Sequence, residues 1–185
     1  MNAMIAWLRR PLIRFGRDRR GVSAVEFALI LPVMLTIYLG GNQLSHALTI
    51  SRKVTHVASA LGDLVTQSKN ITNSDMTNIL GAAASVMYPY PTASVLTIKI
   101  SGVTIDSNGK ATVTWGDQLN TTALTPGTVV ALPSAVDVPS TFLVVAEVHY
   151  AYTPTIGYVM TGTFDLHDQF YLRPRLSDTI TRSAT

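Results

Sequence analysis

The sequence predicts an α+β fold, in which a long N-terminal helix packs on a small antiparallel β-sheet. The first third of the chain holds a long apolar run followed by apolar residues at helical spacing, and segments that alternate like strands begin only after residue 90. Charged residues make up 14% of the 185 residues, against about 25% in an average soluble protein, and the mean hydropathy is +0.28. We therefore expect lipid or a partner to cover part of this chain.

Residues 22–41 have the length and composition of a membrane span. They carry a single charge, Glu26, and about twenty apolar residues let a helix cross the hydrocarbon core. The run is longer than the apolar core of a signal peptide, about 7–15 residues. Pro32 lacks an N–H and is expected to bend or loosen the helix locally. The simplest interpretation of Glu26 is a carboxylate that snorkels to the interface.

Basic residues are concentrated before this run. Six of the fourteen lie within residues 9–20, opposed only by Asp18, whereas beyond residue 21 ten acidic residues outnumber eight basic ones. Lys and Arg collect on the cytoplasmic side of a span, so this asymmetry predicts a single-pass protein with a cytoplasmic N-terminus. This basic block accounts for the sequence pI of 9.3, so the high pI does not indicate that the protein binds nucleic acid.

The helix is expected to continue beyond the membrane as an amphipathic segment, residues 42–69. Its apolar residues recur at spacings of four, three, four and three, which places them on one face: Ile50, Val54, Val57, Leu61 and Leu64. This predicts one helix from about residue 22 to residue 67. The polar residues 70–75 are predicted to form the loop that ends it.

Residues 70–185 are predicted to form one β-rich domain outside the membrane. The expected elements are a helix at about 76–87, a hairpin of strands 95–105 and 111–115, a long loop at 116–140, a central strand at 141–152 and a further strand at 163–173. Asn108 and Gly109 mark the hairpin turn, because this pair readily takes positive φ. Trp115 is expected to pack in the core rather than to bind a ligand.

No residue pattern points to catalysis or to a cofactor. The chain has no cysteine, no HExxH, no Gly-rich phosphate loop and no GxSxG turn. Asp165, His167 and Asp168 offer metal-ligating side chains, but exposed polar residues on a strand face account for them more simply. Arg173 and Arg175 either meet an anionic partner or form a solvated strand end. We expect neither enzymatic activity nor a metal site.

The residues around Gly21 resemble the processing site of type IV prepilins. Such a site has a short basic leader that ends in Gly and a Glu at the fifth position of the mature helix. With Val22 as the first mature residue, Glu26 is the fifth. The pair Glu26-Phe27 resembles the tight-adherence (Tad, or Flp) branch, and RRGVSAVEFALILPVML is similar to the TadE-like pseudopilins or minor pilins of that system.

Two C-terminal segments resemble the same family. Residues 148–154 resemble its Y-x-Y-x-P strand, and residues 170–175 resemble its closing R-P-R element. The resemblance covers residues 19–68 and, less closely, 141–176, and it leaves 70–140 unmatched.

The resemblance implies a minor pilin or pseudopilin that takes part in assembly of a Tad pilus used for surface attachment. A prepilin peptidase would remove residues 1–21, and the new amine of Val22 would pair with Glu26 of a neighbouring subunit. Phe27 would belong to the same assembly motif. The partners implied are the membrane, the peptidase, other pilin-like subunits and the assembly platform.

The location implied is the inner membrane with a periplasmic C-terminal domain, or an extracellular pilus. The competing interpretation is a signal-anchored adhesin or sensor. It explains the helix and the domain but not the spacing of Gly21 and Glu26.

Overall fold

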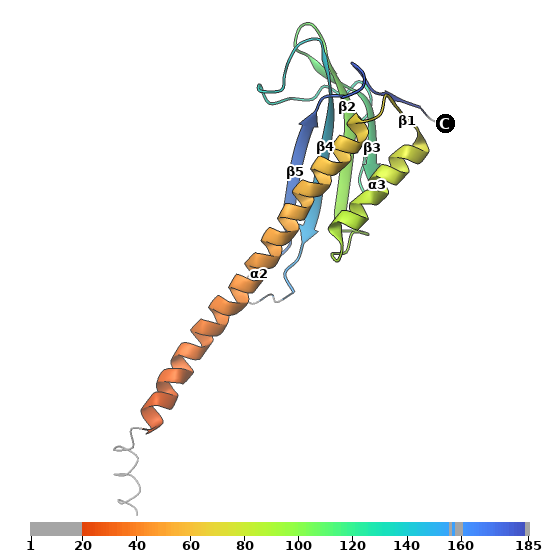
Figure 1. Ribbon diagram of the computed structural model, residues 1–185. Helices are drawn as coiled ribbons and strands as arrows, with labels where there is room; N and C mark the ends of the chain where they lie inside the picture. The colour runs from red at the N-terminus through yellow and green to blue at the C-terminus, as the bar shows by residue number, and fades with distance from the viewer. Residues whose placement is uncertain (1–19, 156, 158–160, 184–185) are drawn as a thin grey trace, which may run out of the picture.

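The computed structural model describes residues 20–155, 157 and 161–183, so most of the predicted leader lies outside the described part. Within it, α2 (Arg20–Thr66) is one helix of 47 residues that continues through Pro32. Figure 1 shows the N-terminal half of α2 projecting away from residues 70–183, which we call the head. Its C-terminal half lies along the head. The predicted long helix is confirmed.

Four antiparallel strands form the sheet of the head: β2 (Leu96–Ile105), β3 (Ala111–Leu119), β4 (Thr141–Tyr152) and β5 (Phe164–Leu172). Their order is β3-β2-β4-β5, so the strand predicted to be central, β4, lies inside the sheet. In the β2–β3 turn, Asp106 Oδ1 accepts hydrogen bonds from the backbone N–H groups of Asn108 (2.8 Å) and Lys110 (2.9 Å). Gly109 takes the positive φ of +80° that the turn requires. The α+β prediction is confirmed.

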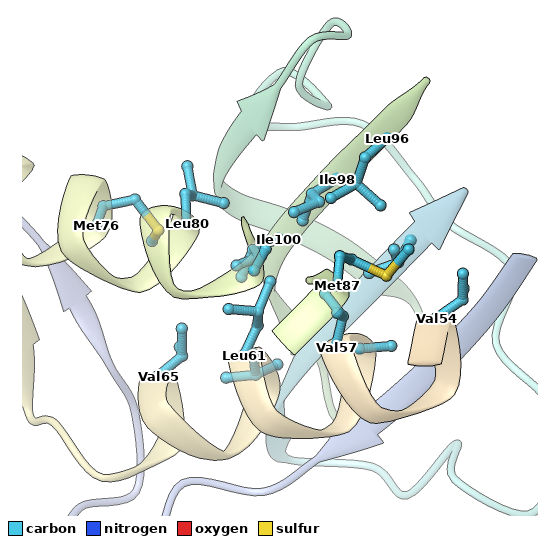
Figure 2. Packing of buried hydrophobic residues seen from close by; sticks show 14 of the residues in the cluster. Val54, Val57, Leu61, Val65, Met76, Leu80, Met87, Leu96, Ile98 and Ile100 are labelled. Carbon is cyan, nitrogen blue, oxygen red and sulfur yellow. The ribbon is translucent and has the colours of Figure 1, made fainter. Parts of the chain in front are cut away.

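Two helices cover one face of this sheet. α3 (Asn73–Met87) packs beside the C-terminal half of α2, and both place apolar side chains against β2 and β4 (Figure 2). The larger buried side chains of this interface include Val54, Val57, Leu61 and Val65 of α2, Met76 and Met87 of α3, Leu96, Ile98 and Ile100 of β2, and Val144 and Val148 of β4. Each such side chain contributes about 1.5–3 kcal/mol when fully buried. This interface fastens α2 to the head.

Leu64 does not belong to the buried face of α2, contrary to the prediction. It is 40% exposed, and Val65 is fully buried instead. Successive residues of a helix turn by about 100°, so a residue four positions after Leu61 points closer to its direction than a residue three positions after it. Gly62 lets α2 approach β5 closely, because a Cβ there would collide with the side chain of Leu172.

Residues 70–75 are not the predicted loop. Asn70–Ile71 form β1, which pairs in parallel with β6 (Thr181–Arg182), and α3 begins directly afterwards. Thr72 is the N-cap of α3: its Oγ1 accepts a hydrogen bond from the N–H of Asp75 (3.2 Å), and Asp75 Oδ2 accepts one from the N–H of Thr72 (3.0 Å). This reciprocal pair is a capping box. The polar composition of this stretch is therefore that of a helix start.

The long loop packs on the second face of the sheet. β3 extends to Leu119, so the loop is shorter than predicted and spans residues 120–140. Its apolar residues Leu124, Val130, Leu132 and Val136 pack on Val103, Ile105, Ala111, Val113, Leu143 and Val145. The N–H of Val113 donates to the carbonyl of Thr128 (2.9 Å), and the N–H of Val130 donates to that of Ala111 (3.1 Å). The loop thus covers both part of this face and the free edge of β3.

Candidate functional site: the N-terminal half of the long helix

Apolar side chains cover the projecting half of α2. Every side chain from Gly21 to Tyr38 is exposed, and the exposed fraction reaches 63% at Phe27 and 71% at Leu29. By length and composition, α2 is the one helix of the described residues that is suited to crossing a membrane. Lipid would remove this apolar surface from water, while the helix satisfies its own backbone hydrogen bonds.

The four residues singled out by the sequence lie together at the start of this helix. Gly21, Val22, Glu26 and Phe27 are all exposed on its first two turns. Glu26 follows Val22 by four positions, so it lies about 6 Å further along the axis on the same side. A Cβ at Gly21 would meet no atom within 4 Å. The geometry is compatible with the predicted roles of these residues, which remain predictions.

A second group of polar side chains lies on the sheet face that points away from the helices. Its centre is His149 on β4, whose Nδ1 lies 2.8 Å from Oδ2 of Asp165 and whose Nε2 lies 2.7 Å from Oε1 of Glu147. His167 of β5 is directly opposite His149 in the sheet register. The two imidazole rings stack with their centroids 5.2 Å apart, and His167 Nδ1 lies 3.6 Å from Asp165 Oδ2.

Two carboxylates contact His149 and shift its pKa. Burial by itself lowers the pKa of His149, but the hydrogen bonds with Glu147 and Asp165 outweigh it and raise this pKa above the ordinary value. Lys99 Nζ lies 3.7 Å from Glu147 Oε1 and adds a positive charge at the edge of the group. The result is a network of hydrogen bonds and ion pairs across β2, β4 and β5.

Asp168 does not join this group, although the sequence places it beside Asp165 and His167. It lies on the helix-covered face, where its Oδ2 accepts a hydrogen bond of 2.6 Å from the hydroxyl of Thr55. Successive residues of a strand point to opposite faces, so positions 165 and 167 share a face that position 168 cannot share. The third residue beside Asp165 and His167 is His149. The sequence pattern did not group it with them, because it lies on another strand, β4.

Residues 21–61 match the protein-family model described as TadE-like protein. This segment, 41 of the 185 residues, is similar to TadE-like proteins. The match spans the exposed half of α2 and most of the half that packs on the head, and it includes all four predicted site residues. The match relates this helix to the Tad pilus system. Neither the curated proteins nor the solved structures yielded a match.

Residues 148–154, the first of the two C-terminal segments singled out in the sequence, lie beyond the family match and hold α2 on the sheet. Tyr150 and Tyr152 occupy alternate positions of β4, so both point towards α2, and both are buried. The Tyr152 hydroxyl donates a hydrogen bond of 2.9 Å to Gln43 Oε1. Burial raises the pKa of both tyrosines, which keeps the hydroxyl protonated as a donor. Pro154, also buried, ends this segment.

The second C-terminal segment, residues 170–175, contacts the C-terminal end of α2. The backbone N–H of Arg175 donates to the carbonyl of Thr66 (3.0 Å), and the Arg175 guanidinium forms an ion pair with Asp63. A positive charge is favourable there, because the C-terminal end of a helix carries partial negative charge. Arg173 is exposed. The role of Arg175 is therefore to cap α2.

Two polar residues of α2 that fasten it to the head could not be recognised in the sequence. Gln43 is only 4% exposed and accepts the hydrogen bond from Tyr152. Lys53 Nζ donates to the carbonyls of Val86 (2.8 Å) and Tyr88 (2.9 Å) at the C-terminal end of α3, where helix carbonyls lack partners. Each side chain contacts a segment that is distant in the sequence, so no local pattern predicts the contact.

Proposed function

We propose that this protein is a minor pilin or pseudopilin that takes part in assembly of a Tad (Flp) type IV pilus used for surface attachment. The observation that carries the proposal is the TadE-like helix, whose exposed N-terminal half presents Glu26 one turn beyond Val22. This half of α2 needs apolar surroundings. Lipid supplies them before assembly, and the helices of neighbouring subunits supply them in a pilus.

The proposal assigns a role to each part of the chain. Residues 1–21 are a cytoplasmic leader that a prepilin peptidase removes, and residues 22–41 cross the inner membrane. Residues 42–69 carry the helix into the periplasm, and residues 70–185 form the domain that is presented there. The asymmetry of basic residues supports this orientation.

Glu26 is proposed to guide assembly. Cleavage after Gly21 creates an α-amine on Val22, which is positive at neutral pH because its ordinary pKa is about 7.7–8.0. A carboxylate in a low-dielectric layer is costly unless an opposite charge accompanies it. Pairing Glu26 of one subunit with the amine of the next would satisfy both charges and set their register.

The test is Glu26→Gln in cells that carry no other copy of the protein. Gln keeps the size of the side chain, so membrane insertion and cleavage should be unchanged. Removing one partner of a buried ion pair costs about 3–5 kcal/mol, so piliation and surface attachment should fall sharply. The measurements are surface piliation, surface attachment, protein level and the mature N-terminus.

Glu26→Asp is the matched control, because it keeps the negative charge on a side chain shorter by one methylene. It should retain more piliation than Glu26→Gln at equal protein level. Normal piliation in the Gln variant would instead favour a signal-anchored adhesin or sensor in which Glu26 only snorkels.

A further inference from the structure

We propose that His149, Asp165 and His167 bind a divalent transition-metal ion, with zinc as the best fit, on the outer face of the sheet. Two imidazoles and one carboxylate form a donor set that suits zinc and its neighbours. The strands supply these donors from a rigid framework, since His149 and His167 are cross-strand partners and Asp165 lies two positions before His167. The proposal is independent of the role in pilus assembly.

The distances between donor atoms agree with metal coordination. One ligand atom from each residue lies within 4.8 Å of the other two. Asp165 Oδ2 is 2.8 Å from His149 Nδ1 and 3.6 Å from His167 Nδ1. In a tetrahedral site with bonds of about 2.0–2.2 Å, neighbouring ligand atoms are about 3.3 Å apart. The two distances lie on either side of this value, so the proposed site requires rotations of side chains but no change in strand register.

Glu147 supplies the outer support that metal-bound histidines require. A histidine that ligates through one ring nitrogen usually donates its other N–H to a carboxylate, which fixes the tautomer and raises the basicity of the ligand. With His149 bound through Nδ1, its Nε2 faces Glu147 Oε1 at 2.7 Å. Lys99 Nζ lies 3.7 Å from the same carboxylate oxygen and helps to hold Glu147 in place. Glu147 is thus a positioning residue.

Solvent can reach the site. The side chains of His167 and Asp165 are 63% and 55% exposed, whereas that of His149 is 31% exposed. β5, which carries two of the ligands, is an edge strand of the sheet. Three protein ligands leave a fourth coordination position for water or for a donor from another molecule.

The competing interpretation is a hydrogen-bonded network without metal. It explains His149, which lies between two carboxylates, but it leaves His167 with only a 3.6 Å approach to Asp165. A metal ion engages both histidines equally. The two interpretations differ in what can be measured, because only the metal site predicts zinc uptake that depends on both His149 and His167.

The experiment is a zinc titration of the full-length protein in detergent, without an affinity tag, against a chromophoric chelator. The expected result is one zinc per chain at micromolar free zinc. His149→Gln and His167→Gln should each lower the affinity at least tenfold, and Glu147→Gln should lower it roughly 10–100-fold. Circular dichroism of every variant shows whether the fold is kept.

Two variants serve as matched controls. His56→Gln removes an exposed histidine of α2, and Asp168→Asn removes the neighbouring carboxylate on the opposite face; both should leave zinc affinity unchanged. Absence of zinc uptake by the folded wild-type protein would overturn the proposal. So would equal affinity in the wild type and the folded His167→Gln variant.

Discussion

At the scale of single residues, Gly21 allows a clean test of processing. A Cβ at this position would meet no atom of the described protein within 4 Å, so we expect a larger residue to leave the fold intact. We predict that Gly21→Leu prevents cleavage before Val22, because the peptidase is expected to require the small residue. Mass spectrometry of the membrane fraction should show the intact leader in this variant and Val22 as the first residue of the wild type.

Gly41 offers the control for this substitution. It lies in the same helix, and a Cβ there also meets no atom within 4 Å. Gly41→Leu should be processed like the wild type. A mature N-terminus at Val22 in the Gly21→Leu protein would refute the proposed processing site.

At the scale of elements, the start of α3 depends on the capping box of Thr72 and Asp75. Thr72→Ala removes the acceptor of an N-terminal N–H group and should lower the free energy of unfolding by about 1 kcal/mol. Thermal or denaturant unfolding of the full-length protein in detergent, followed by circular dichroism, measures this loss. Ser74→Ala, on an exposed neighbouring residue, should have a much smaller effect.

The same capping box makes stability depend on pH. The hydrogen bonds from the Thr72 side chain and backbone lower the pKa of Asp75 below its ordinary value of 3.8. The ionised form is therefore favoured by folding. Its stabilisation is complete above pH 3.8 and is lost as the pH falls through the lower folded-state pKa. Asp75→Asn should reduce the pH dependence of unfolding in this range, and an unchanged dependence would show that other carboxylates control it.

At the scale of the whole molecule, the head and the C-terminal half of α2 share one core and should fold without lipid. A fragment that starts at Leu44 keeps every deeply buried residue of α2 in that core, from Ile50 to Val65. We predict that this fragment is soluble, with mixed helix and strand in its circular dichroism spectrum and a cooperative melt. A fragment that is disordered at all temperatures would contradict the proposed domain division.

A slightly longer fragment measures the contact nearest to the proposed membrane surface. Starting at Asn42 restores Gln43 and its hydrogen bond with Tyr152. This bond should make the longer fragment more stable by about 1 kcal/mol. Tyr152→Phe should remove the difference between the two fragments, because it deletes the donor and keeps the ring.

The sequence by itself determined the parts of this protein that depend on local periodicity and on continuous motifs. The long helix, the hairpin at Gly109 and the central strand β4 follow from spacings of about 3.6 and 2 residues and from turn chemistry. The TadE-like segment was likewise readable, because Gly21, Glu26 and the apolar run stand in one unbroken stretch.

Only the tertiary structure decided which distant side chains meet. In the structure Val65 rather than Leu64 lies in the core, and Asp168 lies on the opposite face from Asp165. His149 lies beside His167. These outcomes depend on strand register and on the direction from which α2 meets the sheet. Both are set by packing between segments that lie up to about a hundred residues apart, so no local pattern contains them.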